Sequence, residues 1–143
     1  MFKLVKEGRR LIGRFESGDD LLEVLTGLCR RENIRLGTFE IIGAVKNAKL
    51  GYFDQQEKKY TGCVELDKKL EINACLGNIS IKDGEIFCHA HITLADWEGR
   101  AFGGHLMPGT IVFAAEFYIE ELLGAEMVRS LDPKTGLPLW SEQ

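Results

Sequence analysis

The three histidines of the chain lie in two short segments near its middle. His89 and His91 are two residues apart in a stretch of strand-forming residues, and His105 follows a pair of glycines. Side chains alternate between the two faces of a β-strand, so His89 and His91 would project from the same face. Neutral imidazole nitrogens are common zinc ligands, so this pair could form part of a metal site.

A turn between the two segments would bring the third histidine to the other two. The sequence Asp96-Trp97-Glu98-Gly99 separates two strand-like stretches, and Gly99 suits the left-handed position of a three-residue hairpin loop. Continuing the register from that loop places His91 opposite His105. The spacing therefore predicts that His89, His91 and His105 bind one divalent metal ion and leave one coordination position open. Zinc is the metal expected, because it readily accepts three neutral imidazole ligands.

Alternatives to this site stay open on the residues alone. Histidines at strand spacing are often polar side chains on a solvated face, and a bulge at Gly103-Gly104 would turn His105 to the other face. The fourth ligand could be water, a small molecule or Glu116. A tight turn at Pro108-Gly109 would pair His105 with Val112 and leave Glu116 about 13 Å farther along, so a salt bridge is its preferred role.

Length and composition are those of an ordinary globular protein. The chain has 143 residues, of which 45% are hydrophobic and 28% charged, so we expect one domain spanning residues 1–143. No stretch approaches the roughly 20 apolar residues that cross a bilayer, and the first residues lack the apolar core of a signal peptide. We therefore expect a cytoplasmic protein with no membrane partner and with buried, reduced cysteines.

The residue pattern predicts an α+β fold in which one main helix, Asp19 to Glu32, packs on a largely antiparallel β-sheet. Two short strands, Phe2 to Val5 and Arg10 to Phe15, are expected around a turn at Glu7-Gly8. Further strands are expected at residues 38–45, 48–53, 60–64, 70–81 and 110–122, and in the segment that carries His89 and His91.

A tight turn at Asp83-Gly84 sets the register of the strand before the histidines. If Lys82 pairs with Glu85, Asn78 lies opposite His89. Asn78 is then either a partner that orients a metal-bound histidine or an ordinary strand-end amide. At the C-terminal end, the apolar side chains of Leu137, Leu139 and Trp140 could dock back on the body of the domain.

Several segments together resemble the PPC domain, which is shared by plants and prokaryotes. They are Gly43 to Leu50, Leu70-Glu71-Ile72, Gly77 to Ser80, Asp83-Gly84, His89-Ala90-His91, Asp96 with Gly99, Gly103 to Leu106, and Glu116. The resemblance implies an α/β arrangement around a largely antiparallel sheet that assembles as a homotrimer. The histidine trio matches the prokaryotic pattern, so the resemblance also implies a metal site.

The resemblance also bears on DNA binding. Plant members carry the domain after AT-hook segments, and stand-alone prokaryotic members are generally described as candidate DNA-binding proteins. This chain has no Arg-Gly-Arg-Pro hook, its net charge is −4, and its basic residues concentrate in the first strands and at Arg30 and Arg31. We therefore expect weak or undetectable binding to duplex DNA at physiological salt.

Two classes of function fit these observations. One is a metal-binding module with a regulatory or DNA-associated role, and the other is a metal-dependent hydrolase or lyase that uses a zinc-bound water. An enzyme would need a general acid or base near the metal, and the register places none of Glu71, Glu98 and Glu116 there. The sequence therefore favours the module.

Overall fold

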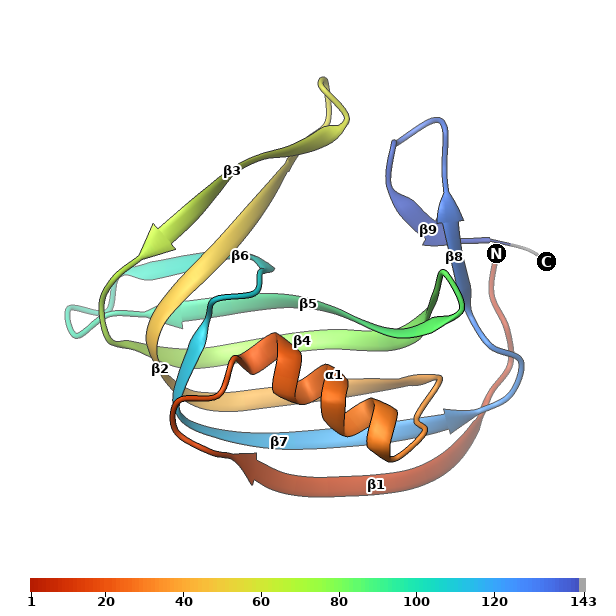
Figure 1. Cartoon of the computed structure of the whole chain (residues 1–143), viewed down its shortest axis with the longest axis horizontal. Helices are drawn as coiled ribbons and strands as arrows, with labels where there is room; N and C mark the ends of the chain where they lie inside the picture. The colour runs from red at the N-terminus through yellow and green to blue at the C-terminus, as the bar shows by residue number, and fades with distance from the viewer. Residues whose placement is uncertain (142–143) are drawn as a thin grey trace.

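The structure is a computed structural model that describes residues 1–141 (Figure 1). One helix lies against a nine-stranded sheet, in which the neighbouring strands are antiparallel except for the parallel pair β4 and β8. The elements are β1 (Lys6–Phe15), α1 (Leu21–Arg31), β2 (Gly37–Asp54), β3 (Lys59–Leu66), β4 (Leu70–Lys82), β5 (Glu85–Ala95), β6 (Ala101–Leu106), β7 (Ile111–Leu123), β8 (Val128–Leu131) and β9 (Pro138–Trp140).

The long strand β2 connects the parts of the sheet. Its first half pairs with β4 on one side and β7 on the other, and its second half pairs with β3 and β6. Because β4 pairs with β5 and β5 with β6, the strands β2, β4, β5 and β6 close into a ring. The two strands that carry the histidines are therefore held on both sides by main-chain hydrogen bonds.

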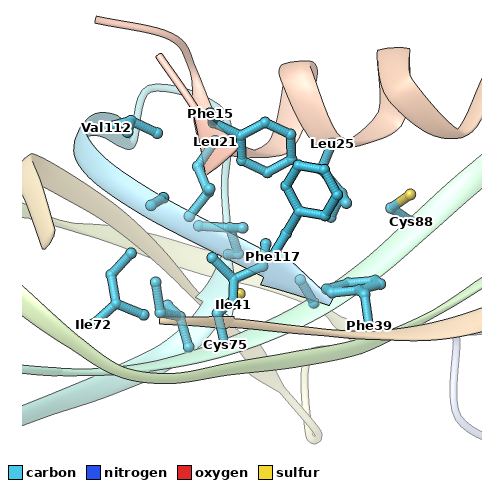
Figure 2. Close-up of a cluster of buried hydrophobic side chains, with 14 of the residues drawn as sticks. Phe15, Leu21, Leu25, Phe39, Ile41, Ile72, Cys75, Cys88, Val112 and Phe117 are labelled. Carbon is cyan, nitrogen blue, oxygen red and sulfur yellow. The ribbon is translucent and has the colours of Figure 1, made fainter. Parts of the chain in front are cut away.

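The core lies between α1 and one face of the sheet (Figure 2). The side chain of Asp20 caps the helix by accepting hydrogen bonds from the backbone N–H groups of Leu22 and Glu23. Leu21, Leu25 and Cys29 of the helix are fully buried. The Cys29 sulfur lies 3.8 Å from the sulfur of Cys88 on β5, so the neighbouring His89 points away from the helix.

The fold class and the helix predicted from the sequence are confirmed. The helix begins after Asp20 and ends at Arg31, and Asn33 takes the left-handed conformation (φ 52°) that ends many helices.

The prediction of two short strands at the N-terminus is wrong, because Lys6–Phe15 form one strand and residues 2–5 form none. A bulge between Glu7 and Arg10 takes the place of the predicted turn and lets pairing with β7 continue. The expected strands at 38–45 and 48–53 are likewise parts of β2.

The chain does turn at Pro108-Gly109, but the pairing of His105 with Val112 expected from that turn is wrong, because β6 and β7 do not pair with each other. Leu106 of β6 pairs with Leu50 of β2, while β7 runs between β1 and β2. The backbone N–H of Gly109 donates to the Asp20 carboxylate, so the chain turns toward the start of the helix. Over residues 1–141, no helix has the length and apolar character needed to span a membrane.

Candidate metal centre

The β4–β5 hairpin has the register predicted from its turn. Asp83 and Gly84 both have positive φ angles, 53° and 80°, as a type I′ turn requires, and Lys82 pairs with Glu85. Counting back along the two strands, Asn78 lies opposite His89. The two-residue turn thus determines the face from which His89 and His91 project.

The β5–β6 hairpin brings in the third histidine. Gly99 has a φ of 78° and donates its backbone N–H to the carbonyl oxygen of Asp96 at 2.9 Å, which closes the loop. His91 pairs with His105, and the register is unbroken from there to the loop. The bulge considered at Gly103-Gly104 does not occur, so His105 projects from the same face as His91.

Asp96 holds this loop together through its carboxylate. The residue is buried, with 6% of its surface exposed. The carboxylate accepts hydrogen bonds from the backbone N–H groups of Glu98 and Arg100, from Arg100 Nε at 2.9 Å and from Lys68 Nζ at 3.0 Å. Burial raises the pKa of Asp96, but these hydrogen bonds outweigh burial and hold the pKa well below its ordinary value.

We expect the substitution Asp96→Asn to lower the melting temperature by several degrees at neutral pH. Because the folded protein depresses the pKa of Asp96, the carboxylate stabilises the fold above its unfolded pKa, and this stabilisation is lost as the pH falls through the folded value. The difference in melting temperature between wild type and variant should therefore shrink below about pH 4. Asp67→Asn, at an exposed neighbouring position, is the control. Equal melting temperatures for wild type and Asp96→Asn at pH 7 would contradict the role given to Asp96.

The three histidine side chains converge as the sequence predicts. Their ring centroids lie 5.2 Å (His89 to His91), 5.0 Å (His89 to His105) and 5.4 Å (His91 to His105) apart. One ligand nitrogen from each ring lies within 4.8 Å of the other two. Nδ1 of His105 is buried and has no hydrogen-bond partner among the described residues. A buried polar atom without a partner is costly, and coordination of a metal would satisfy it.

The surroundings keep two of the imidazoles neutral. Burial lowers the pKa of His89 to about 4, and the nearby charges of His105, Arg129 and His91 act in the same direction. Burial also lowers the pKa of His105 to about 4, with His91 and Arg129 contributing. At neutral pH these nitrogens carry free lone pairs, which is the form that binds a metal.

The histidines form part of the wall of a pocket of about 700 Å³. The β2–β3 hairpin and the β8–β9 hairpin project on either side of β5 and β6 (Figure 1). Tyr60 of β3 contributes a ring whose centroid is 5.2 Å from that of His105, and Leu137 and Leu139 reach the pocket from the C-terminal segment. The tail therefore docks back on the domain, as predicted. A pocket of this size suits a small organic molecule.

The remaining candidate residues lie outside the histidine cluster. Asn78 accepts a hydrogen bond from Nη2 of Arg129 at 2.9 Å, so its carbonyl oxygen holds an arginine instead of orienting a histidine. Glu116 is exposed on β7, where it pairs with Arg14 and Ile42. Glu71 pairs with Ala95 near the far end of β5, and Glu98 forms an ion pair with Arg100 in the loop. None of the three glutamates belongs to the cluster.

Sequence reasoning missed Arg129 and Tyr60. Arg129 reaches the pocket because β8 pairs with β4 in parallel. Parallel strands are not joined by a tight turn, so no turn residues in the sequence predict this pairing. Tyr60 reaches it because β2 extends past its pairing with β4 and carries β3 with it. In a single sequence, nothing about a basic residue in a short strand near the C-terminus indicates that it lines a pocket.

Solved structures of other proteins have the same fold as this chain. The metal-containing protein AF0104 from Archaeoglobus fulgidus has 36% sequence identity, with a TM-score of 0.92 over 99% of this chain and 100% of that one. A plant- and prokaryote-conserved (PPC) protein from Pyrococcus horikoshii has 38% identity, with a TM-score of 0.92 over 100% of this chain and 98% of that one. A candidate DNA-binding protein from Ralstonia eutropha JMP134 has 25% identity, with a TM-score of 0.77 over 92% and 90% of the two chains.

A curated relative shares the domain within a longer protein. The bifunctional protein GlmU of Synechococcus sp. (strain JA-3-3Ab) is 33% identical over 125 residues, which is 86% of this chain. The match spans only 19% of the length of that relative. Residues 3–123 match the sequence profile of the Plants and Prokaryotes Conserved (PCC) domain. With the fold, the register and the histidines in agreement, the chain belongs to the PCC domain family.

Proposed function

We propose that this protein binds one divalent metal ion, zinc by the chemistry of its ligands, through His89, His91 and His105. The observation that carries the proposal is the buried, unpartnered Nδ1 of His105 inside the histidine cluster. Three neutral imidazoles suit zinc, which would keep a further coordination position for water or a ligand from the pocket. The relative from Archaeoglobus fulgidus, described as metal-containing, supports the proposal.

The same pocket favours a binding module over an enzyme. A zinc ion with an open position can activate water, so a metal-dependent hydrolase or lyase is the second candidate. Such a reaction needs a positioned general acid or base, but none of the described residues that line the pocket is Asp or Glu. Burial raises the pKa of the Tyr60 hydroxyl, so it stays protonated at neutral pH and is a poor general acid. We therefore propose a regulatory, ligand-sensing role.

Direct DNA binding gains little support from the basic residues of β1. Arg9 pairs with Glu121 and Glu32, Arg10 with Glu120, and Arg14 with Glu16, so neighbouring carboxylates offset these charges. Phosphate contacts need clustered cations that are free to pair with DNA. Weak binding to duplex DNA therefore stays a prediction, and any DNA-associated role would run through a partner protein.

We also propose assembly as a homotrimer and a reducing, cytoplasmic location. The four cysteines form no disulfide; three of them are buried as expected, whereas Cys63 is exposed. Cysteines without disulfide bonds fit a reducing compartment, which supports this part of the proposal. Exposed apolar side chains gathered on one face of the sheet support the trimer.

Elemental analysis of protein purified without an affinity tag tests the metal proposal. We expect about one metal ion per chain for the wild type and less than a tenth of that for His105→Ala. Cys63→Ser is the matched control, because Cys63 is exposed on β3 and could otherwise bind metal adventitiously. Metal-free wild type after purification in zinc-supplemented buffer, or full stoichiometry in His105→Ala, would contradict the proposal.

A further inference from the structure

Arg129 is the most buried cation beside the candidate metal centre. It lies on β8, is 9% exposed, and is held by three neutral acceptors at 2.9 Å each: Ser80 Oγ, Asn78 Oδ1 and the carbonyl oxygen of Pro138. Its guanidinium also lies over the rings of Phe87 and Trp140, at 5.4 and 5.5 Å from their centroids. Contacts on several sides therefore hold the guanidinium of Arg129 in place.

This charge has no acidic partner in the part of the chain that the structure describes. Arg9, Arg10, Arg14, Arg35 and Arg100 each pair with a carboxylate, whereas the groups that hold Arg129 are all uncharged. Burying an unpaired cation is unfavourable. A guanidinium has five N–H groups, and the three contacts use three of them, so two are left to donate.

The charge of Arg129 also faces the histidines. It lines the same pocket as His89 and His105, and its field disfavours protonation of both imidazoles. A divalent ion on the histidines would add a second positive charge to one wall of a mostly apolar pocket, whose other sides include Phe53, Phe87 and Leu137. Two cations that share a low-dielectric pocket attract an anion between them.

We propose that the pocket takes a small organic carboxylate, whose oxygens bind the metal and accept hydrogen bonds from Arg129, while its apolar body lies against the β2–β3 and β8–β9 hairpins. This inference rests on the proposed metal site. Arg129 is the anion-binding residue, and Ser80 and Asn78 are positioning residues that hold its guanidinium. The pocket volume of about 700 Å³ accommodates a molecule of metabolite size.

The test is a titration followed by the fluorescence of Trp140, whose ring lies against Arg129. Trp97→Phe removes the only other tryptophan and serves as the background. The zinc-loaded protein is titrated with cyclohexanecarboxylate, with its neutral amide, and with inorganic phosphate. We expect saturable binding of the carboxylate, at least tenfold weaker binding of the amide, and at least tenfold weaker carboxylate binding after Arg129→Gln. Equal affinity for carboxylate and amide, or tighter binding of phosphate than of the carboxylate, would overturn the proposal.

Two further variants make the result specific to Arg129. Lys82→Gln removes a positive charge that lines the same pocket and lies 5.2 Å from the Phe87 ring, and it should change the affinity less than threefold. Arg129→Lys keeps the charge but loses the planar pair of donors, so it should still weaken binding and serves if Arg129→Gln does not fold. An equal loss in Lys82→Gln and Arg129→Gln, or wild-type affinity in Arg129→Lys, would overturn the role of Arg129.

The same titration on zinc-free protein separates this inference from the metal proposal. If the chain binds no metal but still binds the carboxylate through Arg129, the proposed metal function fails, and of this inference only the role of Arg129 as the anion-binding residue stands. If the chain binds metal and the affinity for the carboxylate does not depend on Arg129, only the anion site fails.

Discussion

Replacing Gly77 with alanine is expected to destabilise the protein by about 3 kcal/mol or more, because no space exists for the added carbon. Gly77 lies on β4 between β2 and β5, where it pairs with Phe39 and Ala90. A Cβ at this position would lie 2.0 Å from the carbonyl oxygen of His89 and 2.3 Å from Cζ of Phe39. The oxygen belongs to the sheet backbone, so it cannot move without disturbing the strand that carries His89.

Gly27→Ala is the matched control for this prediction. Gly27 lies on α1, and the nearest atom to an added Cβ is a terminal nitrogen of Arg31 at 3.7 Å. Alanine favours a helix over glycine, so this change should stabilise the protein by about 0.5–1 kcal/mol. Urea unfolding curves of both variants give the measurement. Similar midpoints for Gly77→Ala and wild type would show that the close approach of β2, β4 and β5 at Gly77 is wrong.

The candidate metal centre could be predicted because short-range signals determine it. The turn at Asp83-Gly84 sets which face His89 occupies, and the turn that ends at Gly99 pairs His91 with His105. Each turn joins two strands that are consecutive in the sequence. In an antiparallel hairpin, the turn residues and the strand alternation determine the register without any knowledge of the rest of the fold.

The part of the pocket wall that β2, β3 and β8 contribute could not be predicted, because it depends on pairings between segments far apart in the chain. Arg129 reaches its place through the parallel pairing of β8 with β4, and Leu50 brings the end of β2 to Leu106 of β6. Neither pairing follows a turn. The wrong pairing of His105 with Val112 has the same origin. The residues Pro108-Gly109 favour a tight hairpin, but the hydrogen bond from the Gly109 N–H to the Asp20 carboxylate directs the chain toward the helix instead.

The error at the N-terminus has a different cause. Glu7-Gly8 has the residue types of a turn, but Gly8 lies so close to Glu121 on β7 that an added Cβ would be 2.9 Å from its carbonyl oxygen. Glycine is used here for close approach within a bulged strand instead of for a change of direction. A single sequence does not distinguish the two uses.

The exposed face of the sheet carries a row of apolar side chains that supports the proposed trimer. Ile12 of β1 is 73% exposed and pairs with Tyr118 of β7, which is 47% exposed. The row continues across Glu40 to Leu76 of β4, which is 53% exposed and lies opposite His91. Exposed apolar side chains gathered on one face mark a surface that another molecule covers. We infer that further copies of this chain cover it, with three copies as the resemblance to the PPC domain implies.

We expect light scattering at micromolar concentration to give three times the chain mass of 16.1 kDa for the wild type, and the mass of one chain for the double variant Ile12→Glu with Tyr118→Glu. Two carboxylates per chain would be buried without partners in the assembled form, but they would be solvated in the monomer. Val64→Glu is the matched control, because Val64 is 53% exposed on β3, away from this row, and should leave the mass unchanged. The three histidines come from one chain, so the monomeric variant should keep its metal ion. A monomeric wild type, or a double variant that keeps the mass of three chains, would contradict the assignment of this face to the trimer.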